Sequence, residues 1–390
     1  MKKQLLSVFL ADSLILVLCS QAVRAQGNPL KLGQVTSFVP ISPCPAGAGG
    51  SHPLSVAVCY TATVADCSDY TFSPPVIPPL NATVAVSTPL NWNGSTIFLH
   101  NGSSGTEYFS QGQSGLSYAQ DYYNNGFQVV QVAWASDWHD NPGAAVKVMK
   151  YEACRPATLM NYVYTNIHGG PNAKGVMCAQ GHSAGSGAMA YALAWYGAGN
   201  YLADVVLTSG PVYANIEAGC QYPAAQKYKN PITVCPTTQF GCQDGTLGSW
   251  TDFVQYTTGK GGAAQAVAGY TNTPSGNCNN YTGSGQNTNN YNQDWGGTSV
   301  VSAGASYSYP KTRLYAFLCA TGQSQNNSAG QGQLFYTNFT GPGQTLDYKV
   351  YRVDSCGGDE EIWFGTTADG NAFTISSDDM INGCVSSAVR

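Results

Sequence analysis

Residues 175–197 read GVMCAQGHSAGSGAMAYALAWYG. A short apolar run precedes the pentapeptide GHSAG (181–185), and a run of good helix formers follows it. We expect a strand, a very tight turn and a helix in that order, with Ser183 pushed outward at the turn. Gly181 and Gly185 carry no Cβ that would clash with the strand or the helix beside it. A helix that begins directly after Ser183 points the positive end of its dipole at the hydroxyl, which favours an oxyanion there.

The rest of the chain alternates strand and helix patterns. Helical spacing covers 144–167, where Pro156 is expected to kink or divide the helix. A short terminal helix is expected over 378–385. This alternation predicts an α/β fold with a mostly parallel sheet covered on both faces. Strands are expected at 56–64, 82–87, 95–100, 127–134, 203–208, 313–320 and 348–354.

The order of these elements resembles the α/β-hydrolase superfamily over about residues 80–215 and again over about 311–365. The resemblance implies an antiparallel opening to the sheet and a nucleophile elbow at Ser183, as in secreted esterases and lipases. Together with the leader pattern described below, it divides the chain into parts. They are a leader at 1–25, a first part of the core at 26–218, an inserted cap at 219–308 and the last part of the core at 309–390.

The glycine-rich loop after strand 95–100 matches the place where the superfamily puts its oxyanion loop. The loop reads HNGS (100–103). The resemblance implies that the N–H of Ala184 and an N–H of Gly102 or Ser103 bind the oxyanion. Such donors are typically worth about 2.7–4 kcal/mol each.

The other two catalytic positions depart from the superfamily's pattern. The acid usually follows the strand at 313–320, but residues 321–327 contain no carboxylate. The histidine usually follows the strand at 348–354, where this chain has Gly358-Asp359. No histidine follows His182 in the chain.

Three residues are candidates for the base. Asp359 or Glu360 would serve in an acidic habitat or a buried environment, because a carboxylate is a weak base at neutral pH. His139 ends the sequence DWH (137–139), which follows the strand at 127–134 and should lie at the same sheet edge as Ser183. Two readings of function therefore stay open. The protein is a secreted carboxylic ester hydrolase with a non-standard base, or an inactive secreted binding or structural protein.

We do not expect the other histidines near the motif to act as the base. We expect His100 to order its loop, His182 to point away from Ser183, and His168 to lie at the opposite end of the sheet.

The cysteines indicate an oxidising compartment. Residues 1–25 have a basic start, an apolar stretch and a small-residue cleavage site, as in a secretory leader. Of 13 cysteines, 12 follow this leader, and an even number there favours disulfides. We expect cap disulfides among Cys220, Cys235, Cys242 and Cys278, and the resemblance suggests a Cys319–Cys356 bridge between neighbouring strands.

The composition limits the kinds of partner that the protein can bind. Charged residues are 9% of the 390, and the formal net charge is −5, so nucleic-acid binding has no electrostatic support. We expect a monomer without a metal, cofactor or membrane anchor, acting on a small-molecule or polymer ester.

Overall fold

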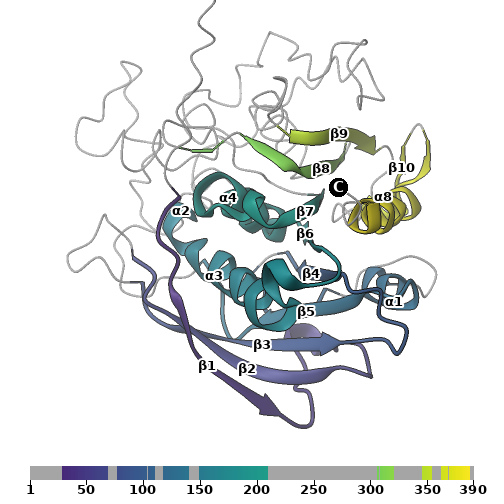
Figure 1. The fold of residues 1–390 in the computed structure, drawn as a ribbon. Helices are drawn as coiled ribbons and strands as arrows, with labels where there is room; N and C mark the ends of the chain where they lie inside the picture. Colours follow the sequence, from purple (N-terminus) through teal and green to yellow (C-terminus); the bar gives the residue numbers. More distant parts are fainter. Residues whose placement is uncertain are drawn as a thin grey trace, which may run out of the picture.

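A nine-stranded sheet forms the centre of the molecule (Figure 1). The structure is a computed structural model. It describes residues 29–68, 77–102, 104–109, 117–139, 149–209, 305–306, 308–319, 345–353, 362–367 and 369–386.

The sheet has the strand order β1-β2-β3-β5-β4-β6-β7-β8-β9. The pairs β1–β2, β2–β3 and β3–β5 are antiparallel, and every pair from β5 to β9 is parallel. An antiparallel opening, the exchange of β4 and β5, and a parallel remainder are the arrangement of the α/β-hydrolase fold, so the predicted fold class is confirmed. The strands are β1 Gln34–Ile41, β2 Val58–Ala65, β3 Leu80–Ser87, β4 Thr96–His100, β5 Gln128–Trp134, β6 Met177–His182, β7 Leu202–Thr208, β8 Tyr309–Cys319 and β9 Thr345–Val353.

Helices cover both faces of the sheet. α3 and α4 pack together on one face with the larger buried cluster, and α1 and α8 pack together on the other (Figure 1). Every residue of α4 is buried, which fits its composition of small and apolar residues on all sides. The helices are α1 Tyr118–Asn124, α2 Met149–Glu152, α3 Cys154–Tyr162, α4 Ala184–Tyr196 and α8 Ala372–Ser386, and a short hairpin of β10 Thr366–Thr367 and β11 Gly370–Asn371 precedes α8. Short helical turns lie at Ala48–Gly50, Val163–His168, Gly170–Asn172, Ala198–Asn200 and Ile362–Phe364.

The helix expected over 144–167 is divided, but the break falls at Ala153 and not at Pro156. Pro156 lies in the first turn of α3, where its missing N–H leaves no hydrogen bond unmade. The terminal helix is longer than expected. It begins at Ala372 because the Asn371 side chain accepts the N–H of Thr374 at 3.2 Å and caps it.

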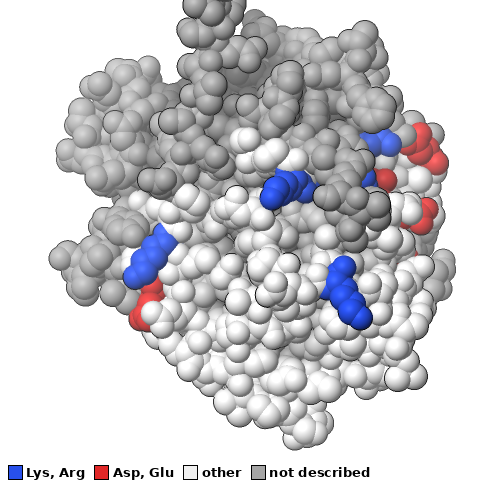
Figure 2. Space-filling view, in the orientation of Figure 1, with Lys and Arg blue, Asp and Glu red and all other residues white. Residues whose placement is uncertain are grey.

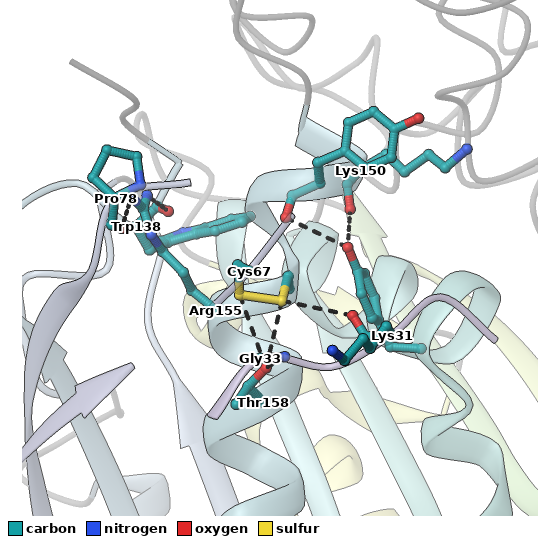
Figure 3. The surroundings of a disulfide bond; sticks show 11 residues. Lys31, Gly33, Cys67, Pro78, Trp138, Lys150, Arg155 and Thr158 are labelled. Carbon is teal, nitrogen blue, oxygen red and sulfur yellow. Dashed lines mark hydrogen bonds between the residues drawn. A yellow bond between two sulfur atoms is a disulfide. The ribbon is translucent and has the colours of Figure 1, made fainter. Parts of the chain in front are cut away.

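Three disulfides tie the described part of the chain together: Cys44–Cys59, Cys67–Cys154 and Cys178–Cys384. The bridge from Cys178 joins the central strand β6 to α8, and the bridge from Cys67 joins the segment after β2 to the start of α3 (Figure 3). The expected use of cysteines in disulfides is confirmed for these six. The four cap cysteines, the Cys319 side chain, Cys356 and almost all of 219–308 lie outside the described residues.

Charged side chains are sparse on the face of the molecule drawn in Figure 2. Among the described residues on that face they lie singly or in small groups that mix both signs, and uncharged residues cover most of it. The described part of this face carries no patch of a single sign that would attract a charged polymer.

Candidate active site

Ser183 occupies a sharp turn between the central strand and the buried helix. β6 ends at His182 and α4 begins at Ala184, so this one residue makes the whole connection. Its φ is 51° and its ψ is −122°, a conformation that residues with a side chain rarely adopt. The N–H of Ser183 donates to the carbonyl of Thr208 at 2.9 Å, and its own carbonyl accepts the N–H of Ser186 at 2.9 Å. These bonds hold the turn between β6 and α4, whose position the sequence predicts.

Three glycines allow the turn to form. A Cβ at Gly181 would lie 2.4 Å from the carbonyl oxygen of Gly185, and one at Gly185 would lie 2.2 Å from that of His100. A Cβ at Gly102 would lie 2.6 Å from the Cβ of Ser183 and 3.3 Å from its Oγ. The strand, the helix and the loop after β4 therefore meet backbone against backbone, and Gly102 lies directly against Ser183.

The start of α4 and the loop after β4 flank the partly exposed Ser183. Ala184 is the first residue of α4, whose opening N–H groups have no acceptor within the helix. On the other side, the carbonyl of Gly102 accepts the N–H of Gly105 at 2.9 Å, which closes the loop into a turn.

Two of the histidines are structural. His100 is fully buried, and its Nε2 accepts the indole N–H of Trp134 at 2.9 Å, so the ring proton sits on Nδ1 and is donated to the carbonyl of Asn101 at 2.9 Å. Burial lowers the pKa of His100 to about 4. His168 bonds the hydroxyl of Thr96, at the opposite end of β4 from His100. Both expectations for these histidines are confirmed.

His182 is held beside the turn by its neighbours. Its Nδ1 lies 3.3 Å from the hydroxyl of Thr208, and its ring packs 4.8 Å from that of Trp363 and 6.2 Å from that of Phe109. Burial lowers the pKa of His182 to about 4, so the imidazole is neutral in the folded protein at ordinary pH.

His139 is paired with a carboxylate. Its Nε2 lies 3.0 Å from Oδ1 of Asp137, and the two side chains are 26% and 34% exposed. The residue between them, Trp138, donates its N–H to the carbonyl of Ser104 at 3.1 Å. Because Ser104 belongs to the same turn as Gly102, the His139 segment is tied to the loop that touches Ser183.

The structure thus brings together part of the set predicted from sequence. Ser183, Ala184 and Gly102 adjoin one another, and His139 lies on a segment bonded to the Gly102 loop. The contacts of Thr208 with this turn were not predicted. Thr208 lies in β7, two strands from β4, and it binds the turn only through its carbonyl and its hydroxyl. Such contacts leave no pattern in the sequence. Ser103, Asp359 and Glu360 lie outside the described residues.

Within the described ranges, no group of three or more His, Cys, Asp and Glu side chains is arranged to hold a metal ion. No helix in the same ranges is both long and apolar enough to span a bilayer.

No protein family and no curated protein matches the chain in sequence. Solved structures share its general arrangement at low identity. Candida antarctica lipase A in its closed state is 12% identical, with 91% of each chain covered and a TM-score of 0.44. Acetyl xylan esterase 1 from Thermoanaerobacterium sp. is 10% identical, with 80% of each chain covered and a TM-score of 0.41. Esterase B from Lactobacillus rhamnosis is 10% identical over 87% of this chain and 88% of its own, with a TM-score of 0.43.

Replacing Ser183 by glycine should stabilise the protein relative to Ser183→Ala. Glycine adopts the conformation at φ 51° freely, whereas alanine keeps the strain of about 1–3 kcal/mol. The greater freedom of glycine in the unfolded chain offsets about 0.4–1 kcal/mol of this. We expect a net gain of about 1–2 kcal/mol in the free energy of unfolding, measured by denaturant titration. A glycine variant less stable than the alanine variant would show that the turn is not strained.

Acid should destabilise the protein in part through His182. Its pKa is about 4 when folded, below the usual value of about 6.5 in the unfolded chain, so the unfolded state binds more protons between these values. The contribution of neutral His182 is complete above pH 6.5 and is lost as the pH falls toward 4, by roughly 3 kcal/mol at most. In His182→Gln the free energy of unfolding should therefore fall less between pH 7 and pH 4.5. An identical fall in the variant and the wild type would contradict this.

Proposed function

We propose that the protein is a serine hydrolase that cleaves carboxylic esters with Ser183 as the nucleophile. The observation that carries the proposal is the strained backbone of Ser183 at the strand-to-helix turn, with Gly102 packed against its Cβ. Strain of this kind persists only where the surroundings impose it, and it gathers at functional sites. Glycine would adopt this backbone conformation without that strain.

The reaction would proceed by acyl transfer. Ser183 Oγ attacks the ester carbonyl while a base takes the hydroxyl proton, and the carbonyl oxygen becomes an oxyanion. The N–H of Ala184 and an N–H of Gly102 or Ser103 stabilise that charge by about 2.7–4 kcal/mol per donor. The alcohol leaves with the proton, and water then attacks the acyl group on Ser183 by the same steps in reverse.

His139 is the proposed base. An imidazole is suited to proton transfer near neutral pH, and a carboxylate beside it stabilises the imidazolium formed during the reaction. Asp137 supplies that carboxylate at 3.0 Å. Asp359 and Glu360 would be the base instead if replacing His139 leaves the reaction intact.

We also propose that the protein is secreted. The leader pattern at 1–25 and the three disulfides of the described chain support an oxidising compartment. Protein recovered outside the cell should begin at Gln26, and a retained Met1 would contradict the leader.

A fluorophosphonate probe tests the nucleophile. We expect Ser183 to be labelled in the wild type and labelling to disappear in Ser183→Ala, with hydrolysis of p-nitrophenyl acetate falling at least about 10³-fold. Ser87→Ala is the matched control. Ser87 is buried in β3, its hydroxyl has no hydrogen-bond partner among the described residues, and its loss should change neither readout.

The outcome also separates the two readings of function. Labelling should be tested at pH 5 as well as pH 8, because a carboxylate base would work better at the lower pH. A folded wild type that is unlabelled at both values would overturn the hydrolase and favour an inactive binding protein.

A further inference from the structure

A buried arginine holds the segment that carries His139. Arg155 is 2% exposed and lies in the first turn of α3. Its Nη1 donates to the carbonyl of Trp138 at 2.8 Å, and its Nη2 donates to the carbonyl of Pro78 at 2.8 Å (Figure 3). Burying a guanidinium carries a large desolvation cost, which hydrogen bonds must offset. One side chain thus fixes two segments that are distant in sequence.

Trp138 is fixed from its other side as well. Its N–H donates to Ser104, and its fully buried ring lies edge-on to that of His100, with 5.9 Å between the centroids. A Cβ at Gly105 would lie 2.9 Å from Cδ1 of the same indole. Trp138 therefore has one position relative to the loop that touches Ser183, and the residues on either side of it share that constraint.

The two residues beside Trp138 form the carboxylate–imidazole pair. Oδ1 of Asp137 meets Nε2 of His139 at 3.0 Å and also accepts the backbone N–H of His139 at 3.3 Å. A carboxylate bound at Nε2 sets the orientation of the ring and leaves Nδ1 for the proton of a substrate or nucleophile.

The arginine itself sits on a braced helix. The neighbouring Cys154 is bridged to Cys67, and the hydroxyl of Thr158, one turn further on, accepts the N–H of Gly33 at 2.9 Å (Figure 3). These links attach α3 to the segments before β1 and after β2. Arg155 is therefore presented to Trp138 from a rigid support.

We propose that Asp137 and Arg155 are positioning residues for His139, Asp137 by orienting its ring and Arg155 by fixing the main chain at Trp138. The proposal deepens the proposed function and rests on it. Catalytic groups need such support, because a displacement of about 1 Å can lower a reaction rate about 10²-fold.

Steady-state hydrolysis of p-nitrophenyl acetate by the full mature protein tests the proposal. Asp137→Asn should lower kcat by about 10²–10⁴-fold with KM unchanged, because substrate binding does not use the pair. Arg155→Met should lower kcat by about 10–10²-fold, also with KM unchanged. Arg155→Lys keeps the charge but not the fork that reaches two carbonyls, so it should recover only part of the loss.

A matched control separates positioning from stability. Cys44→Ala with Cys59→Ala removes a disulfide between β2 and the segment after β1, and it leaves the Cys67–Cys154 bridge, Arg155 and the two carbonyls that Arg155 binds in place. This double variant should lose stability yet keep kcat within about twofold below its melting temperature. Asp137 is partly exposed, so Asp137→Asn should fold even if Arg155→Met does not.

The possible failures are distinguishable. If Ser183→Ala and His139→Gln abolish turnover while Asp137→Asn retains it, the positioning role is wrong and the hydrolase stands. If His139→Gln retains turnover while Ser183→Ala does not, the base lies elsewhere, and the positioning role is again wrong. If Ser183→Ala retains turnover, the proposed function itself is wrong.

Discussion

The close approach of three backbone segments at Ser183 is the constraint on which the rest of the structure depends. A side chain at Gly181, Gly185 or Gly102 would meet main-chain or Cβ atoms at 2.2–2.6 Å. With glycine at all three, β6 passes into α4 through a single residue, and the loop after β4 lies against it. Because β4 and β6 are neighbours with His100 opposite Gly181, the register of the sheet places that loop where it is needed.

Uncharged side chains make most of the hydrogen bonds that hold the region around Ser183. His100 and His182 are buried without charge and use their ring nitrogens to bind Asn101, Trp134 and Thr208. Arg155 is charged, and it donates to the main-chain carbonyls of Trp138 and Pro78. Buried uncharged side chains of this kind suit a chain in which only 9% of residues are charged.

The sequence predicts the sheet well, because buried parallel strands are short apolar runs between turn residues. The observed ends of β4, β5 and β7 lie within one residue of those expected. It does not predict α1, whose sequence YAQDYYN lacks an apolar stripe and which is buried through its tyrosines. Glycine spacing located the turn at Ser183. The contact between Arg155 and Trp138 was not predictable, since tertiary packing joins residues 17 positions apart in the chain.

The central claim is that the strained serine forms a covalent bond to an acyl group. Rapid mixing with p-nitrophenyl acetate, acid quenching and peptide mass spectrometry would test it directly. The account predicts one acetyl group on the peptide that contains Ser183, formed by the folded protein and not by the denatured one. Acetylation that is absent from that peptide, or that is unaffected by unfolding, would contradict it.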